Sequence, residues 1–205
     1  PNGIAEAFII GEEFIGNSSI TLILGDNIFH GSTLKKLLKT SFKMQEGATI
    51  FAYPVKDPEK YGVIEFDHFN KVISIEEKPT NPKSIYAITG IYVFDNTVIK
   101  KAKSIKPSLR GELEITDIHN SYMEEQNLSV NILERGSAWL DTGNVDSLHE
   151  ASSYIRTLEH RQGLKVGCPE EIAWENKWID KYQLIKLSEE YMKSGYGKYL
   201  KELLN

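Results

Sequence analysis

The segment Ile20-Thr21-Leu22-Ile23-Leu24-Gly25-Asp26-Asn27 joins a short, partly β-branched apolar run to a group of turn residues. A continuous apolar run of this length predicts a strand buried on both faces, as in a parallel sheet. Apolar residues with helical spacing follow over 34–42, and residues 48–55 form a second apolar run. Strand, helix and strand within about 35 residues predict a βαβ unit and therefore an α/β sheet.

The same reading extends in both directions along the chain. Apolar residues with helical spacing over 4–12 predict a helix that ends at Gly16-Asn17. Further strands are expected at 62–66, 71–76, 86–94 and 128–133, the first two as a hairpin, and further helices at 96–103, 115–126, from 145 onward, and from 169 with a break at 194–197. We expect an α/β domain over residues 1–150 and a helical C-terminal region over residues 151–205.

Composition excludes several classes of protein. The 205 residues include 24 Lys and Arg against 29 Asp and Glu, a net charge of −5, whereas a nucleic-acid binder normally carries a basic face. No apolar run approaches the ~20 residues of a membrane span, and Pro1-Asn2-Gly3 does not open a signal peptide. One cysteine, Cys168, excludes an intrachain disulfide and a multi-cysteine zinc site. We expect a soluble, cytoplasmic chain that binds neither nucleic acid nor membrane.

Two aspartates stand where apolar segments end. Asp26 follows the first predicted strand, and ligands of open α/β sheets bind at the carboxyl ends of strands; the Gly-Asp-Asn sequence is equally typical of a plain turn. Asp141, in Trp139-Leu140-Asp141-Thr142-Gly143, could instead cap the helix that follows. Two such carboxylates could share Mg²⁺, but their spacing does not establish that they are close.

A charged cluster, Glu76-Glu77-Lys78-Pro79, ends another predicted strand. Such a cluster is usually a solvated strand end; alternatively Glu77 accepts hydrogen bonds from hydroxyls and Lys78 binds a phosphate. Tyr61-Gly62 is either a turn or a place where the backbone approaches a ligand. The five histidines show no metal-ligand spacing, and no Gly-x-Ser-x-Gly element or phosphate-binding glycine loop occurs.

Five segments occur together in a characteristic order. They are Leu24-Gly25-Asp26-Asn27-Ile28-Phe29, Tyr61-Gly62-Val63, Glu76-Glu77-Lys78-Pro79, Arg110-Gly111-Glu112-Leu113-Glu114-Ile115-Thr116-Asp117 and Ala138-Trp139-Leu140-Asp141-Thr142-Gly143. The set resembles the bacterial glucose-1-phosphate thymidylyltransferases, which are sugar-nucleotide pyrophosphorylases. The likeness extends over nearly the whole chain, including Gln162-Gly163-Leu164-Lys165 and Pro169-Glu170-Glu171-Ile172. It implies a Rossmann-like mixed sheet of the nucleotide-diphospho-sugar transferase type with a helical C-terminal appendage.

The resemblance implies a reaction and a role for each matching residue. Glucose 1-phosphate and dTTP would give dTDP-glucose and pyrophosphate, the first step of dTDP-rhamnose and related polysaccharide synthesis. Asp26 and Asp141 match the carboxylates that bind Mg²⁺, and Lys78 matches the lysine on the sugar phosphate. The remaining matches concern the sugar and the base: Glu77 and Gly62 for sugar hydroxyls, Tyr61, Ile88 and Trp139 for the shape of the glucose pocket, and Gly3 for an approach to the thymine ring.

The family also implies a homotetramer and a second, regulatory nucleotide site. Gly31, Arg135, Glu171 and Ile172 stand where the residues of that site would be. The family opens with a strand and a Gly-rich loop carrying Arg and Lys, and this chain starts after it, so 205 residues by themselves are expected to be inactive. A sister enzyme using UTP or CTP, and a non-catalytic fragment that assembles with a separate N-terminal piece, stay open as alternatives.

Overall fold

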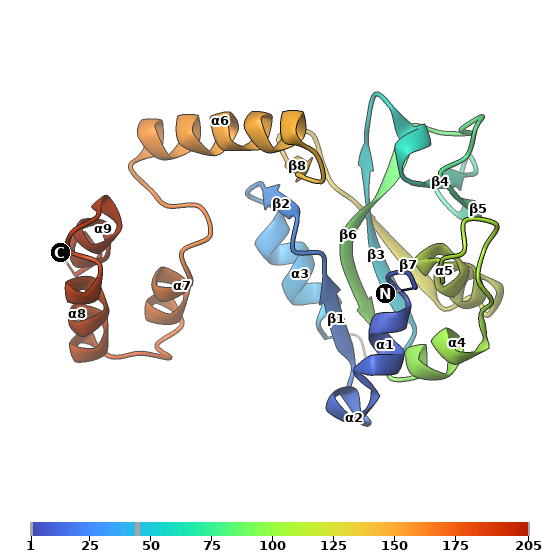
Figure 1. Cartoon of the computed structure of the whole chain (residues 1–205), viewed down its shortest axis with the longest axis horizontal. Coiled ribbons are helices and arrows are strands. Elements are labelled where there is room, and N and C mark those ends of the chain that lie inside the picture. The colour runs from blue at the N-terminus through green and yellow to red at the C-terminus, as the bar shows by residue number, and fades with distance from the viewer. Residues whose placement is uncertain (1, 44–45, 205) are drawn as a thin grey trace. The chain divides into compact units, whose positions relative to one another are not determined.

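The computed structural model describes residues 2–43 and 46–204. The chain divides into two compact units, residues 1–142 and residues 143–205. The sequence suggested a boundary at residue 150, but helix α6 (Val145–Gln162) runs through that position. Each unit is described by itself below, and both are seen in Figure 1.

In the first unit, the described strands form one mixed sheet and one two-stranded ribbon. The sheet has the order β5-β4-β6-β3-β7, with β1 paired to β6 beside this path. Its strands are β1 (Ile20–Ile23), β3 (Ala48–Pro54), β4 (Gly62–Phe66), β5 (Val72–Glu77), β6 (Tyr86–Phe94) and β7 (Leu128–Ile132). Strand β3 is parallel to β7 and antiparallel to β6, and β4 and β5 form the expected hairpin. The predicted α/β class is confirmed.

The βαβ unit predicted from the first apolar run exists, but the placement of its first strand differs from the prediction. Strands β1 and β3 both run antiparallel to β6, one on each side of it, so β6 lies between the two parallel strands. Strand β1 is partly exposed along its length, whereas Ala48–Ala52 of β3 are buried. The expectation that β1 is buried on both faces is therefore wrong, and among the described residues β6 is its only strand partner.

Helices cover both faces of the sheet. Alternate residues of β3 point to opposite sides, so Ile50 and Ala52 join one core and Phe51 joins the other. The first core contains residues of α1 (Glu6–Ile10), α4 (Val98–Ser104) and α5 (Ile115–Glu124). The second contains residues of α3 (Leu34–Ser41) and of the ribbon. The single helix predicted over 4–12 is two short ones, because α1 ends at Gly11 and α2 (Glu12–Ile15) follows it.

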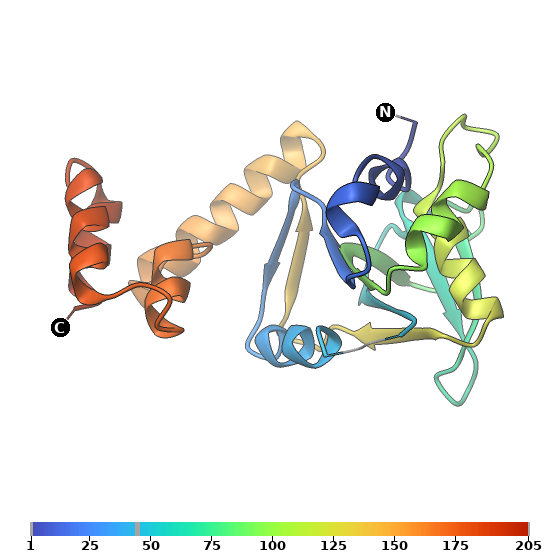
Figure 2. The ribbon, with the colours of Figure 1, turned by 90° about the horizontal axis from the view of Figure 1, so that it is seen from below.

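The two-stranded ribbon joins β2 (Asn27–His30) to β8 (Ala138–Asp141) in antiparallel register. Figure 2 shows the two strands side by side. Sequence patterns predicted neither strand, since four residues are too few to show a period. The ribbon packs through Trp139 and Phe29 against the second core. It brings together two segments that are more than a hundred residues apart in the sequence, and both carry predicted site residues.

The second unit is helical. It contains α6, α7 (Pro169–Glu175), α8 (Lys181–Glu190) and α9 (Gly195–Glu202). Helices α6 and α8 begin with capping boxes, and Gly163 ends α6 in the left-handed conformation. Leu184, Tyr199 and Leu200 are central to its core. The predicted break at 194–197 lies three residues earlier, at 191–194, since α8 ends at Glu190 and α9 begins at Gly195. No described helix of the chain combines the length and apolarity that a membrane crossing requires.

Candidate active site

A pocket of about 250 Å³ lies in the first unit, lined by the ribbon, by the middle of β6, by the start of β4 and by the end of β5. Eight of the residues singled out from the sequence line it: Asp26, Tyr61, Gly62, Glu77, Lys78, Ile88, Trp139 and Asp141. They come from separate segments, and the fold assembles them in one place. Its lining contains five carboxylates but only three basic side chains, Lys60, Lys78 and Arg110. A phosphate ligand would therefore need an additional cation in this pocket.

The ribbon brings the two predicted metal carboxylates close in the fold, since Asp141 ends β8 and Asp26 directly precedes β2. Asn27 pairs directly with Asp141, and facing residues of an antiparallel pair have Cβ atoms about 4.5–5.5 Å apart. The backbone oxygen of Asp26 accepts hydrogen bonds from the N–H and the hydroxyl of Thr142, each at 2.8 Å. The alternative that Asp141 caps a helix is wrong, because Asn144 caps α6 instead.

The carboxylate pair fits Mg²⁺ better than a metal with an all-protein ligand set. No group of three or more His, Cys, Asp or Glu side chains suited to a metal occurs within residues 2–43 and 46–204. Mg²⁺ is typically bound by one or two carboxylates together with water and substrate phosphate oxygens. Asp26 and Asp141 provide that number of carboxylates in a pocket that also contains basic side chains.

Asn27 is a site residue that sequence reasoning missed. Its Oδ1 accepts hydrogen bonds from Nε1 of Trp139 at 2.6 Å and from the backbone N–H of Gly90 at 3.1 Å. Its Nδ2 donates to Oδ1 of Asp26 at 2.8 Å. The segment Gly-Asp-Asn was recognised for its aspartate, and only the tertiary structure shows that the asparagine contacts three parts of the pocket.

Aromatic side chains form one wall of the pocket. Trp139 is 8% exposed, and its ring centroid lies 5.0 Å from that of Tyr61 and 6.1 Å from that of Tyr53. Burial, together with the nearby charge of Asp141, raises the pKa of Tyr61. The phenol therefore stays neutral at physiological pH and can donate or accept a hydrogen bond. Rings of this kind commonly present a flat apolar surface to a ligand.

Lys78 has an unusual backbone conformation. It follows β5 with φ of 41°, in the left-handed region that non-glycine residues seldom occupy. Its backbone N–H donates to the carbonyl of Tyr61 at 3.0 Å, which ties the end of β5 to the start of β4. Strained conformations of this kind persist where the surrounding structure holds them and are concentrated at functional sites.

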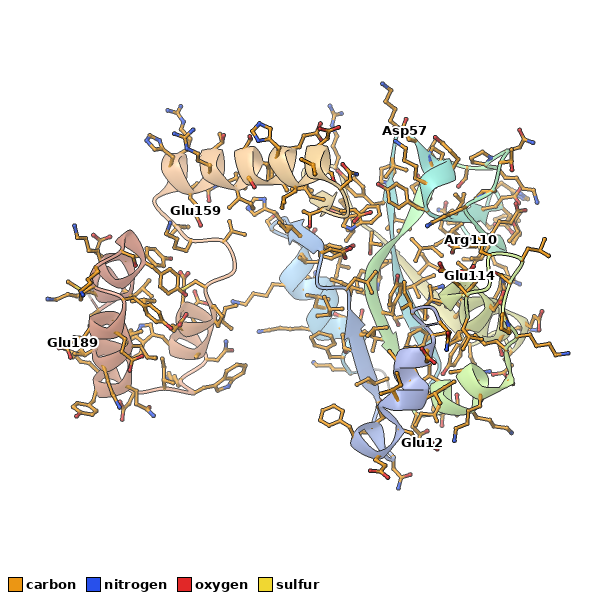
Figure 3. The ribbon with its side chains drawn as sticks, viewed as in Figure 1. Glu12, Asp57, Arg110, Glu114, Glu159 and Glu189 are labelled. Atoms are coloured by element: carbon orange, nitrogen blue, oxygen red, sulfur yellow. The ribbon has the colours of Figure 1, made fainter. Side chains whose placement is uncertain are left out.

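Glu77 is a half-buried carboxylate whose charge is partly compensated. Burial raises its pKa, and the charge of Glu114 raises it further. The Arg110 guanidinium lies 3.5 Å from carboxylate oxygens of both Glu77 and Glu114 and 3.4 Å from one of Glu112. Figure 3 labels Arg110 and Glu114, which lie close together beside the sheet. The Arg-Gly-Glu-Leu-Glu segment was noticed in the sequence, but its arginine was given no role there.

The backbone around the pocket leaves little space at Gly62. A Cβ atom there would lie 2.9 Å from Cγ2 of Thr116 and 3.3 Å from both Oε2 of Glu77 and Cδ1 of Ile88. Glycine is therefore required by close packing of the pocket wall rather than by a turn.

Gly3 is not among the described residues that line the pocket, although its neighbour Ile4 is. Its φ is 117°, and a Cβ atom would lie 2.5 Å from the carbonyl oxygen of Leu113. The fold thus gives Gly3 a backbone role, and an approach to a base stays a prediction.

The four predicted regulatory residues are divided between the two units. Gly31 follows β2, and an added Cβ would contact the side chain of Ser137, two residues after the exposed Arg135. In the second unit, Glu171 accepts a hydrogen bond from the Tyr199 hydroxyl at 2.6 Å, and Ile172 is exposed. A common site for these four residues stays a prediction.

Comparison with known proteins places the chain in a family. The nucleotidyl transferase family matches residues 1–157. A glucose-1-phosphate thymidylyltransferase from Neisseria meningitidis is 52% identical over 204 residues, and one from Mycolicibacterium smegmatis is 54% identical over 205. Each alignment covers 100% of this chain and 71% of the relative.

Solved structures agree with this result. A crystal structure from Bacillus anthracis, described as a glucose-1-phosphate thymidylyltransferase in complex with sucrose, matches with a TM-score of 0.66 and 42% identity, over 75% of this chain and 61% of that one. A UDP-glucose pyrophosphorylase bound to UDP-glucose shares the fold at 24% identity, with a TM-score of 0.63 over 76% of this chain and 63% of the other. The chain therefore belongs to the nucleotidyl transferase family and, within it, to the glucose-1-phosphate thymidylyltransferases.

Proposed function

We propose that the pocket binds glucose 1-phosphate and transfers to it a thymidylyl group from dTTP, in the presence of Mg²⁺. A phosphate oxygen of the sugar phosphate forms a bond to the α-phosphorus of the nucleotide. The bond from that phosphorus to the oxygen that bridges it to the β-phosphate breaks, and pyrophosphate leaves. Such a reaction requires mainly positioning and charge neutralisation from the protein. The observation that supports the proposal best is the gathering of Asp26, Asp141, Glu77 and Lys78 around one pocket.

Each polar side chain has a role in this proposal. Lys78 binds the sugar phosphate as a point charge. Glu77, held beside Arg110, accepts hydrogen bonds from sugar hydroxyls. Trp139 and Tyr61, whose rings are tilted by 60° to each other, form the apolar wall against which the sugar ring lies. Asp26 and Asp141 would hold Mg²⁺, which would supply charge neutralisation for the phosphate groups. This distribution of charge accounts for the surplus of carboxylates in the pocket.

Product analysis identifies the nucleotide that the protein uses. The full-length gene product is incubated with glucose 1-phosphate, Mg²⁺ and either dTTP, UTP or CTP, and the sugar nucleotide is identified by ³¹P NMR and mass spectrometry. The proposal predicts dTDP-glucose as the main product. A larger rate with UTP or CTP would favour a sister pyrophosphorylase. Lack of turnover with all three would favour a non-catalytic role.

The proposal extends to assembly, location and regulation, where family likeness is the support. It includes a homotetramer in the cytoplasm, a place at the start of dTDP-rhamnose synthesis, and a regulatory nucleotide site that uses Gly31, Arg135, Glu171 and Ile172. Sedimentation equilibrium measures the assembly. Inhibition of the enzyme by dTDP-rhamnose tests the second site separately from the first. This inhibition should persist at saturating dTTP and should be lost in Arg135→Ala.

A further inference from the structure

We propose that Asn27 is a positioning residue that aims the Asp26 carboxylate and connects it to the wall of the sugar pocket through Trp139. Three hydrogen bonds of its side chain carry this inference. The assignment goes beyond the roles proposed above, and its kinetic test rests on the proposed function.

The orientation of the Asn27 amide follows from its partners. Side-chain amides can be placed in either of two orientations, and the hydrogen-bond network decides between them. The Trp139 indole N–H and the Gly90 backbone N–H can only donate, so the atom that faces both must be the carbonyl oxygen. The NH₂ group therefore faces Asp26, and its hydrogen bond there is a donation to a carboxylate oxygen, at 2.8 Å.

Neighbouring strands and the Trp139 side chain hold Asn27 in position. It stands opposite Asp141 in the ribbon. A Cβ atom on Gly90 would lie 2.5 Å from its Oδ1, so β6 approaches the amide as closely as only glycine permits. Trp139 is in turn held by packing against Tyr53 and Tyr61. The Asn27 oxygen accepts two hydrogen bonds from groups that are themselves fixed by packing. The amide is therefore held in place, and its NH₂ group can hold the neighbouring exposed carboxylate in one orientation.

This arrangement gives the Asp26 carboxylate a hydrogen-bond donor of fixed position. One oxygen of Asp26 accepts from Asn27, which leaves the other oxygen for a cation. Partners that orient metal-binding side chains typically contribute about 10–100-fold to metal affinity or activity.

Two variants separate orientation from folding. Asn27→Leu is similar in shape but removes the amide, and Asn27→Asp keeps an acceptor for Trp139 and Gly90 while removing the donor to Asp26. Crystal structures of the metal-free full-length protein are compared at pH 8. We expect the Asp26 carboxylate to leave its position beside residue 27 in both variants. An Asp26 side chain that keeps the same single orientation in both would overturn the proposal, and this comparison is independent of the reaction.

Kinetics provide the second measurement. In an assay of pyrophosphate release, Asn27→Leu should raise the Mg²⁺ concentration that gives the half-maximal rate by about 10-fold or more. It should also lower kcat by a larger factor than it raises KM for glucose 1-phosphate. The matched control is Asn131→Leu, because the Asn131 amide donates to Ser41 and lies outside the pocket lining. An equal Mg²⁺ requirement in Asn27→Leu and the control would overturn the positioning role. If the unsubstituted protein shows no turnover, the proposed function fails and the crystal structures still decide on Asn27.

Discussion

Asn27 and Asp141 face each other across the β2–β8 ribbon, and this pairing brings Asp26, the residue before β2, to the same end of the ribbon as Asp141 although 114 residues separate them in the sequence. The ribbon is anchored by Trp139, whose indole is buried against two tyrosines. A four-residue ribbon thus holds both carboxylates at one edge of the pocket, and a change at either carboxylate should affect catalysis far more than stability.

Asp141→Asn tests this expectation. The substitution keeps the size of the side chain and removes one charge, so kcat should fall by about 10²–10³ or more, whereas the melting temperature should change little. Asp146→Asn, an exposed aspartate in the first turn of α6, is the control that should leave kcat unchanged. Near-normal turnover of Asp141→Asn would refute its role in metal binding.

Lys78→Gln tests the phosphate contact. Because the phosphate would lose its charged partner, we expect weaker binding of glucose 1-phosphate and a lower kcat. Gln at this position has the same left-handed backbone strain as Lys, so strain does not account for a difference. Lys71→Gln, on the hairpin outside this pocket, is the control. An unchanged rate at saturating sugar phosphate would favour the reading of Lys78 as a solvated strand-end charge.

Gly62→Ala tests the close packing of the pocket wall. The added methyl group would lie 2.9 Å from Cγ2 of Thr116, and overpacking of this kind typically costs about 1–3 kcal/mol. We expect a lower free energy of unfolding and a higher KM for glucose 1-phosphate. The double variant Gly62→Ala with Thr116→Ser removes the opposing methyl group and should recover part of both losses. No recovery in a urea-unfolding comparison would show that another contact limits the space at Gly62.

His119 makes stability depend on pH. It is fully buried on α5 against Tyr92 and Phe94, and neither ring nitrogen hydrogen bonds within the described part of the chain. Burial lowers its pKa from 6.5 to about 3. Between these values the unfolded chain binds a proton that the folded chain does not. Its contribution to stability is therefore complete above about pH 6.5 and is lost as the pH falls toward 3.

His119→Phe is the variant that isolates this effect. For the unsubstituted protein, this histidine should lower the free energy of unfolding by about 2 kcal/mol between pH 7 and pH 5. Urea unfolding at both pH values should show a smaller decrease for His119→Phe, while the exposed His149→Gln should behave like the unsubstituted protein. The same pH dependence in His119→Phe would assign the effect to other groups.

Much of the fold follows from local patterns, and the limits of that reading have physical causes. The strand over 86–94 and the hairpin over 62–76 were predicted closely, because their apolar patterns are long or are bounded by turn residues. The pairing of β1 was not predicted, since a continuous apolar run does not identify the partner strand. The ribbon was missed because each of its strands has only four residues.

Some residues of the candidate site could likewise be predicted from the sequence, and others could not. Residues that carry charge next to a turn, such as Asp26 and Lys78, are visible in a sequence as candidates for function. Asn27 and Arg110 have roles that depend on partners from distant segments, namely Trp139 for the first and Glu77 for the second. Such roles become visible only when the fold brings the partners together.

The most direct test of the central claim is a crystal structure of the full-length protein with glucose 1-phosphate. The account predicts the sugar phosphate in the pocket between Trp139 and β5, with its phosphate within hydrogen-bond distance of Nζ of Lys78 and a sugar hydroxyl within hydrogen-bond distance of the Glu77 carboxylate. A sugar phosphate bound elsewhere on the protein, with Lys78 and Glu77 making no contact to it, would contradict the account.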